Sequence, residues 1–247
     1  MSVPATEIES TSASVLSDYP EEVKIITGLP RPIEVVAALI ALMITGPIMA
    51  IAAIATALQS HGPILFRQER VGLGGRPFTL YKFRTMVWRN SGPQVTASND
   101  QRITTLGAFL RKTKLDELPE LWNVLRGDMS FVGPRPEVPC YVNRDDPMWQ
   151  QVLFVKPGVT HPVTVRLRNE EMLISAAGND SERFYLEVLL PYKLQGYLAY
   201  QRTRTWRSDL KVIALTLIAV LCRSKVPLPE LHTILDQGAV ENRTTSR

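Results

Sequence analysis

The sequence has little of what disulfide-bonded and zinc-binding proteins need. Its 247 residues include two cysteines, Cys140 and Cys222, and three histidines. The cysteines lie far apart in the chain, and no Cys/His metal-ligand spacing is present. We therefore expect free thiols in a reducing compartment rather than a disulfide framework or a Cys/His metal site.

Several sequence signatures are also missing. No internal repeat is visible. The glycines of residues 72–75 match neither a P-loop nor a dinucleotide-binding fingerprint, so they favour a turn. Residues 1–30 are too acidic for the leader of a signal peptide, and the apolar run that follows them is too long for one. We expect a flexible acidic tail over residues 1–30 and no cleaved targeting signal.

Charge is absent from residues 35–58 and uneven elsewhere. Residues 1–30 carry five acidic side chains and one lysine, a net charge of −4, so the total of +4 leaves +8 on residues 31–247. A basic body suits lipid head groups, nucleotide phosphates or nucleic acid, and charge alone does not choose among them. As a helix, the uncharged run rises about 36 Å, enough to cross a hydrocarbon core of about 30 Å.

Gly46 and Pro47 interrupt the middle of the uncharged run. A proline there removes a helical hydrogen bond and clashes with the preceding turn, which predicts a sharp bend. Bent helices that span membranes exist, so the bend alone leaves the topology open. The cations flanking the run favour a cytoplasmic location for both of its ends; they are Arg31, Arg67, Arg70 and Arg76.

Local patterns predict further elements. Residues 64–71 and 77–86 are expected to form two strands joined as a hairpin, and residues 100–112 a helix with Leu106, Phe109 and Leu110 on one side. Lys156–Thr160 is expected to form a turn. Residues 212–222 carry no charge and are apolar except for Thr216, and they lie between cationic flanks. They are too short to span a bilayer and favour an interfacial helix, with a buried core helix as the alternative.

A pair of carboxylates, Asp116 and Glu117, opens the most informative segment. Pro119 is tolerated only in the first turn of a helix, and Gly127 supplies a typical helix stop. Four apolar residues recur at helical spacing between these points: Leu118, Leu121, Trp122 and Leu125. The carboxylates are therefore placed at a helix N-terminus, which lowers a carboxylate pKa and attracts phosphate. The alternative is that Asp116 only caps the helix.

Cationic side chains accompany the carboxylate pair. Arg111 lies one turn upstream, and the prolines on either side of Arg135 fix its backbone for bidentate phosphate contacts. Lys82 and Arg84 alternate with an aromatic residue on a predicted strand and can point together at a phosphate or lipid head group, or else form a solvated strand face.

Four motifs together closely resemble the bacterial sugar transferases called monotopic polyprenol-phosphate phosphoglycosyl transferases. They are Gly62–Gly72, Tyr81–Met86, Lys114–Glu137 and Lys156–Thr160, and the resemblance covers residues 31–225. It implies a mixed α/β, mainly helical fold with a re-entrant helix-break-helix over residues 31–60. A cytoplasmic catalytic domain with a β-hairpin and interfacial amphipathic helices follows over residues 61–225, and a tail over residues 226–247.

The resemblance also implies a reaction. Such enzymes transfer a sugar-1-phosphate from a UDP-sugar to undecaprenyl phosphate and release UMP, which initiates exopolysaccharide, capsule or O-antigen assembly at the bacterial inner membrane. Asp116 would be the nucleophile, and Glu117 would help to deprotonate the acceptor phosphate or would tune the site. Arg111, Arg135 and Arg168 would stabilise the transferred charge. Mg²⁺ would be held by Asp116 and substrate oxygens.

The chain departs from the family pattern at two places. Gly46 stands where a serine is common, so no serine hydroxyl can bond to the backbone there. The segment after Thr160 lacks a common tryptophan, although Arg168 still falls on the family arginine. His161 in this segment is expected to be structural, since a lone histidine beside a proline has no catalytic partner pattern.

Two other classes of function are possible from the sequence. An inactive membrane-anchored scaffold would keep the apolar run and the basic body, but the intact Asp116, Glu117 and Arg135 argue against it. A nucleic-acid-binding protein would need a basic recognition helix or interleaved aromatic residues, and a long uncharged run would be unusual in it. We therefore expect membrane lipids, and no nucleic acid, among the partners.

Overall fold

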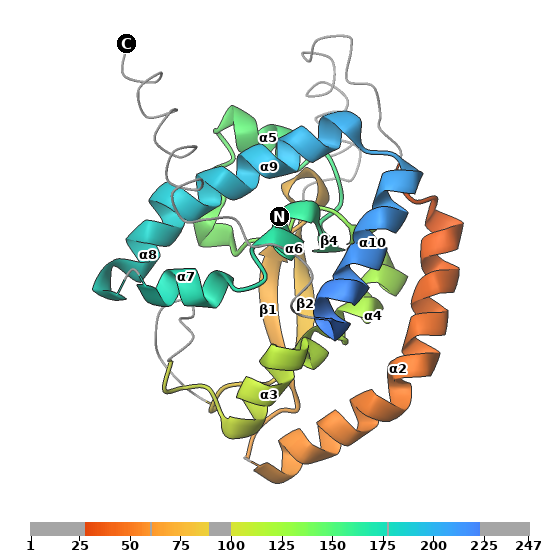
Figure 1. Ribbon diagram of the computed structural model, residues 1–247, viewed down its shortest axis with the longest axis vertical. Helices are drawn as coiled ribbons and strands as arrows, with labels where there is room; N and C mark the ends of the chain where they lie inside the picture. The colour runs from red at the N-terminus through yellow and green to blue at the C-terminus, as the bar shows by residue number, and fades with distance from the viewer. Residues whose placement is uncertain (1–27, 60, 89–99, 177, 223–247) are drawn as a thin grey trace, which may run out of the picture.

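The computed structural model describes residues 28–59, 61–88, 100–176 and 178–222 (Figure 1). The predicted C-terminal tail and nearly all of the predicted acidic tail lie outside these residues. Helices dominate, and two small two-stranded sheets lie among them. The mixed, mainly helical fold class is therefore confirmed.

The first part of the chain contains helix α2 (Arg31–Gln59), strands β1 (Leu65–Val71) and β2 (Pro77–Phe83), helices α3 (Thr105–Thr113) and α4 (Glu120–Arg126), and strand β3 (Ser130–Val132). The second part contains α5 (Pro147–Val152), β4 (Gly158–Thr160), α6 (Pro162–Arg166), α7 (Glu170–Ala176), α8 (Ser181–Phe184), α9 (Leu190–Thr203) and α10 (Trp206–Leu221). Short 3₁₀ turns occur at Leu73–Gly75, Leu115–Glu117, Pro139–Tyr141 and Gly178–Asp180, and a π turn at Tyr185–Leu189.

Helix α2 contains the predicted bend. Pro47 lies inside the helix, which Figure 1 shows bending near its middle. The Thr45 hydroxyl donates to the Ala41 carbonyl oxygen at 2.7 Å, a back-bond that often accompanies helix bending. Gly46 itself has no hydroxyl to bond to the backbone, as expected from its residue type, but Thr45 makes such a bond at the preceding residue.

Both ends of α2 are attached to the rest of the described chain. At the first end, two guanidinium nitrogens of Arg31 donate to main-chain oxygens of α4 at 2.7 and 2.8 Å, and the buried Glu34 carboxylate accepts from β3. At the other end, Arg84 donates to the Thr56 carbonyl oxygen at 3.2 Å. The middle of the helix, in contrast, exposes large apolar side chains such as Met43.

The first sheet is the predicted hairpin. β1 and β2 pair antiparallel from Leu65 opposite Phe83 to Val71 opposite Pro77. Gly74 and Gly75 have φ of 62° and 74° in the connecting turn, a conformation that favours glycine. β2 ends at Phe83, three residues earlier than predicted. The buried Asn123 of α4 fastens that helix to the hairpin, because its side-chain amide donates to a β2 carbonyl oxygen at 2.7 Å.

The second sheet was not predicted. β3 and β4 pair in parallel, with Ser130 opposite Gly158 and Val132 opposite Thr160. The chain just after β3 approaches β4 so closely that a Cβ atom at Gly158 would lie 2.0 Å from the Gly133 nitrogen. The prediction of a turn over Lys156–Thr160 is thus wrong for its last three residues, because pairing with a distant strand overrides the local Pro-Gly signal.

Some predicted helix faces also differ. Phe109 of α3 and Trp122 of α4 belong to the predicted apolar helix faces, but 55% and 50% of their surface is exposed. Val124 is fully buried in place of Trp122. α3 begins at Thr105 rather than residue 100, because the Thr104 side chain caps it by accepting from the Gly107 nitrogen.

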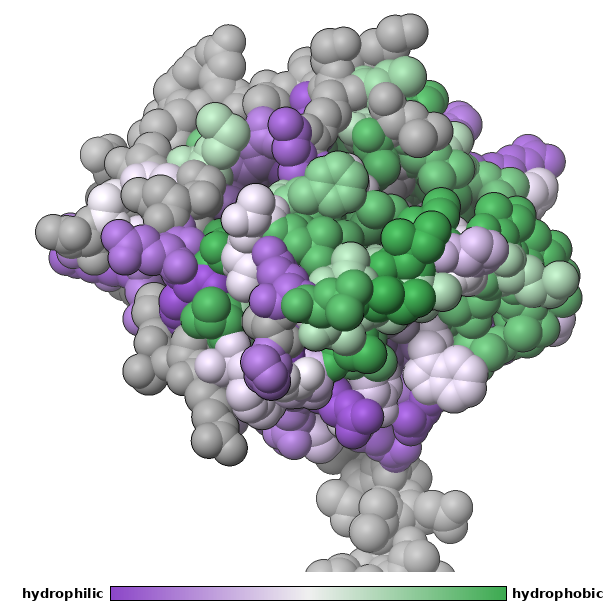
Figure 2. Space-filling view, turned by 90° about the horizontal axis from the view of Figure 1, so that it is seen from below, coloured by the Kyte–Doolittle hydropathy of each residue, from purple (hydrophilic) through white to green (hydrophobic). Residues whose placement is uncertain are grey.

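Helix α10, which contains most of residues 212–222, has one buried face and one exposed apolar face. Val212 and Ala219 are buried, whereas the opposite face exposes apolar side chains; these are Trp206, Leu210, Leu215, Leu217, Ile218 and Val220. Helix α2 likewise has a few buried residues and many exposed apolar side chains. Figure 2 shows hydrophobic surface spread over the lower face of the molecule. The main core lies elsewhere, among α5–α9, around Trp149, Leu189 and Tyr197.

Candidate active site

Asp116 and Glu117 lie in the 3₁₀ turn between α3 and α4. Lys114, with φ of 59°, ends α3 in a left-handed conformation and redirects the chain into this turn. The carboxylates therefore precede α4 rather than occupying its first turn. Asp116 is only 7% exposed, and in the described part of the chain its Oδ1 atom has no hydrogen-bond partner.

The electrostatics of Asp116 differ from the prediction. Burial and the neighbouring Glu117 carboxylate raise the pKa of Asp116, although Lys82, Lys114 and Arg111 oppose the shift. The expected lowering of the Asp116 pKa by a helix N-terminus is therefore wrong, since the side chain accepts no backbone N–H bond at Oδ1 and loses hydration.

Glu117 has the opposite environment. Its Oε1 atom lies 2.6 Å from Arg135 Nη2, 3.2 Å from Lys82 Nζ and 3.8 Å from Lys114 Nζ. Burial opposes ionisation of Glu117, but the charges of Arg135 and Lys82 hold its pKa well below the usual range. Arg135 and Lys82, which the sequence suggested as phosphate-binding residues, thus both contact the Glu117 carboxylate directly.

Glu120 is a third carboxylate at the site that sequence reasoning missed. It is buried, and Lys82 Nζ lies 3.1 Å from its Oε1 atom. Burial raises the pKa of Glu120 against the opposing charge of Lys82. Its spacing of four residues from Asp116 was the available signal, because such residues lie on the same side of a helical turn.

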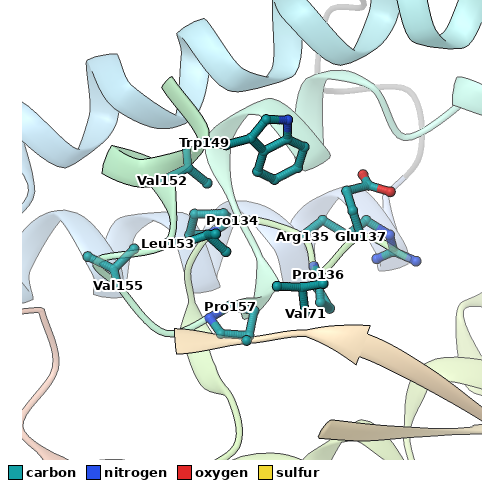
Figure 3. A pocket seen from close by; sticks show the side chains of 11 residues that line it. Val71, Pro134, Arg135, Pro136, Glu137, Trp149, Val152, Leu153, Val155 and Pro157 are labelled. Carbon is teal, nitrogen blue, oxygen red and sulfur yellow. The ribbon is translucent and has the colours of Figure 1, made fainter. Parts of the chain in front are cut away.

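The arginine loop, Gly133–Glu137, brings Arg135 to the carboxylates. It follows β3, and the Pro134 carbonyl oxygen accepts from the Gly158 nitrogen of the second sheet at 2.8 Å. In Figure 3 the side chains of Arg135 and Glu137 lie at one side of a small pocket, whose lining also includes apolar residues such as Pro134 and Val152. Flanking prolines and sheet contacts together fix the position of Arg135.

The other predicted phosphate-binding arginines have different surroundings. Arg111 donates to Thr85 Oγ1 and to Glu171 Oε1 of α7, both at 2.9 Å. Arg168 lies between α6 and α7. Arg84 is buried and donates to main-chain oxygens around the end of α2, contacts that support a structural rather than a phosphate-binding role.

His161 is structural, as expected. It is fully buried, its Nδ1 atom accepts from the Val163 nitrogen at 3.2 Å, and it thereby caps α6. Its ring packs edge-on against Tyr197 and Tyr200. Burial, with a smaller contribution from Arg204, lowers the pKa of His161 to about 3, so the ring is neutral.

A Mg²⁺ ion at this site would need oxygen ligands from the substrate as well as from the protein. No group of three or more His, Cys, Asp or Glu side chains suitable for a metal occurs among the described residues. Mg²⁺ commonly binds through one or two carboxylates together with substrate phosphates. The buried Asp116 Oδ1 atom, without a hydrogen-bond partner in the described structure, is a suitable oxygen ligand.

The chain is similar in sequence to several transferases that act on undecaprenyl phosphate, by their names. A UDP-glucose:undecaprenyl-phosphate glucose-1-phosphate transferase from Caulobacter vibrioides is 37% identical over 197 residues, covering 77% of this chain and 69% of that protein. A putative undecaprenyl-phosphate N-acetylgalactosaminyl 1-phosphate transferase from Bacillus subtilis is 46% identical over 119 residues. These residues cover 47% of this chain and 66% of the Bacillus protein.

A third relative is longer than this chain. The UDP-N-acetylgalactosamine-undecaprenyl-phosphate N-acetylgalactosaminephosphotransferase of Aeromonas hydrophila is 38% identical over 165 residues, which are 62% of this chain but 39% of that protein. The family model described as bacterial sugar transferase matches residues 27–223. That range includes the carboxylate turn, the arginine loop and α2, so the chain belongs to the bacterial sugar transferase family.

Proposed function

We propose that the protein transfers a sugar-1-phosphate from a UDP-sugar to undecaprenyl phosphate and releases UMP. The observation that carries the proposal is the contact of the Asp116–Glu117 turn with Arg135, at 2.6 Å from Glu117. A buried carboxylate oxygen beside fixed cations suits nucleophilic attack on a phosphoryl group. The names of the relatives support the same donor and acceptor classes.

The reaction has two steps. An Asp116 oxygen attacks the β-phosphorus of the donor, forming a new P–O bond while the bond to the α-phosphate oxygen breaks and UMP leaves. A phosphate oxygen of the undecaprenyl acceptor then attacks the same phosphorus and releases the Asp116 carboxylate. A desolvated Asp116, with its raised pKa, suits the first step because its charge lacks compensating hydrogen bonds at Oδ1.

The neighbouring groups have different parts in this proposal. The depressed pKa of Glu117 makes it a weak base, so it is better suited to holding Arg135 and Lys82 beside the transferred phosphate. Arg135 would stabilise charge on that phosphate. Mg²⁺, held by Asp116 and substrate oxygens, would supply further charge neutralisation.

We further propose that α2 enters the membrane and returns to the same side. The attachment of Arg31 to α4 and of Arg84 to Thr56 fixes both ends of the helix to one catalytic unit. The exposed apolar middle of α2 would then lie in the cytoplasmic leaflet of the bacterial inner membrane, and the exposed face of α10 at its surface. The product would initiate a surface glycan.

Turnover by an Asp116→Asn variant tests the nucleophile. The amide cannot form the aspartyl intermediate, so we expect no UMP release from a panel of UDP-sugars with Mg²⁺, even when donor is supplied alone. Wild-type protein incubated with labelled donor should retain the phospho-sugar on Asp116, detectable by mass spectrometry of peptides. Asp145→Asn, at an exposed site, is the matched control and should keep its activity. Robust turnover by the Asp116 variant would refute the assignment.

A further inference from the structure

A buried lysine lies behind the arginine loop. Lys193 of α9 is 2% exposed, and its Nζ atom is surrounded by three oxygens. It lies 2.8 Å from Glu137 Oε1, 2.9 Å from the Tyr185 hydroxyl and 3.3 Å from Glu170 Oε1. An ammonium group has three N–H donors, so these oxygens match its full hydrogen-bonding capacity.

Glu137 connects Lys193 to the arginine loop. It lies two residues after Arg135 and is buried, with its carboxylate also accepting from the Tyr185 hydroxyl at 2.6 Å. Arg70 Nη1 is 3.9 Å from the other carboxylate oxygen and donates to the Pro136 carbonyl oxygen at 2.9 Å. The end of the loop is therefore held by side-chain contacts from three other parts of the chain.

Glu170 connects the same lysine to a second arginine. Glu170 begins α7, and the adjacent Glu171 accepts from Arg111 at 2.9 Å. Arg168 lies two residues before Glu170. The Lys193 ammonium group thus contacts both the arginine loop and the segment that begins at Arg168. That segment also contains Glu171, which contacts Arg111.

A purely stabilising role explains this arrangement poorly. Taking Lys193 and Glu137 out of water is costly, and well-packed apolar residues often serve stability as well as or better than a buried ion pair. The charge-assisted contacts of the pair, in contrast, restrict where the two attached segments can lie. Small displacements of groups that stabilise a transition state cost large factors in rate.

We infer that Lys193 is a positioning residue for phosphoryl transfer, holding Arg135 through Glu137 and the α7 segment through Glu170. The inference rests on the proposed function. It assigns to α9, which contributes no residue to the carboxylate turn, control over the geometry of the arginines. Tyr185 shares the task, because its hydroxyl contacts both Lys193 and Glu137.

Kinetic coupling to Arg135 tests the inference. Lys193→Met removes the charge while keeping an unbranched side chain, and we expect kcat/KM for UMP release to fall about tenfold or more, mainly through kcat. In an Arg135→Ala background the same substitution should cost less than about threefold, because the group that it positions is absent. A role in stability alone would give the same factor in both backgrounds and would overturn the inference.

A milder pair of variants covers the case in which Lys193→Met does not fold. Tyr185→Phe removes the hydroxyl that contacts Glu137 and should lower kcat severalfold only while Arg135 is present. Tyr141→Phe is its control, since it removes a 2.7 Å hydroxyl contact to Glu182 from a ring that packs against Tyr185. Equal effects of the two variants would refute the positioning role. If the wild-type protein releases no UMP, both the proposed reaction and the role of Lys193 are refuted. If it does release UMP, but the variants have the same effect with and without Arg135, only the role of Lys193 is refuted.

Discussion

Asp116 and Glu117 are neighbours with opposite electrostatic environments. Asp116 loses hydration and faces Glu117, which raises its pKa, whereas the cations around Glu117 outweigh its burial and depress its pKa. Pairs of titratable groups whose pKa values are driven apart are typical of sites where the two groups have different tasks. The contrast supports Asp116 as the nucleophile and Glu117 as the residue that holds the cations.

At the same scale, Arg135→Lys tests the use of the guanidinium fork. Lysine keeps the charge but not the planar pair of donors, so we expect UMP release to fall by about tenfold or more. Arg126→Lys is the matched control, because Arg126 is exposed and contacts Asp128 rather than the site. Near-wild-type kinetics for the Arg135 variant would show that charge alone suffices.

At the scale of elements, α2 has two attached ends and an exposed middle. Arg31 and Glu34 are held by α4 and β3, while Ala52 and Thr56 are buried near the other end. A straight membrane-spanning helix would carry its two ends to opposite faces of the bilayer. The bend at Pro47 is therefore the local feature on which the proposed re-entrant topology depends.

Cysteine labelling in intact cells tests that topology. In a background with Cys140 and Cys222 replaced by serine, Ser10→Cys and Arg76→Cys should both resist an impermeant thiol reagent until the cells are opened. Pro47→Ala restores a helical hydrogen bond and should favour spanning, exposing Ser10→Cys to the reagent in some molecules. Labelling of Ser10→Cys with Pro47 intact would contradict the re-entrant topology.

At the scale of the whole molecule, His161 couples stability to pH. Its pKa is about 3 in the folded protein, below the usual value of about 6.5 in an unfolded chain. The unfolded chain therefore binds the extra proton between these values, and stability falls as pH is lowered through this window. The loss should be about 1.4 kcal/mol for each pH unit below about 6.5.

The variant His161→Asn isolates this effect. Asparagine is a favourable helix cap and does not titrate, so it can keep the cap of α6 without the pH dependence. Between about pH 7 and about pH 5, the free energy of unfolding from urea titrations should fall by about 2 kcal/mol less in the variant than in the wild type. If the free energy of unfolding changes equally with pH in the two proteins, protonation of His161 does not destabilise the folded protein.

The sequence by itself determined features that depend on neighbouring residues. Glycines and alternating side chains indicated the hairpin, Pro47 the bend of α2, and Gly127 the end of α4, because each acts through the conformation of its own backbone. The order of motifs from Lys114 to Glu137 also indicated the family, and the prolines beside Arg135 indicated a fixed backbone at that residue.

Only the tertiary structure decided which distant residues meet. Lys82 and Glu117 are separated by 35 positions and Lys193 and Glu137 by 56, and no periodicity reports such contacts. The same limit applies to β4, whose turn-like sequence becomes a strand through pairing with β3. Burial, set by the folded chain as a whole, reversed the expected pKa shift of Asp116, since hydration of a carboxylate depends on everything packed around it.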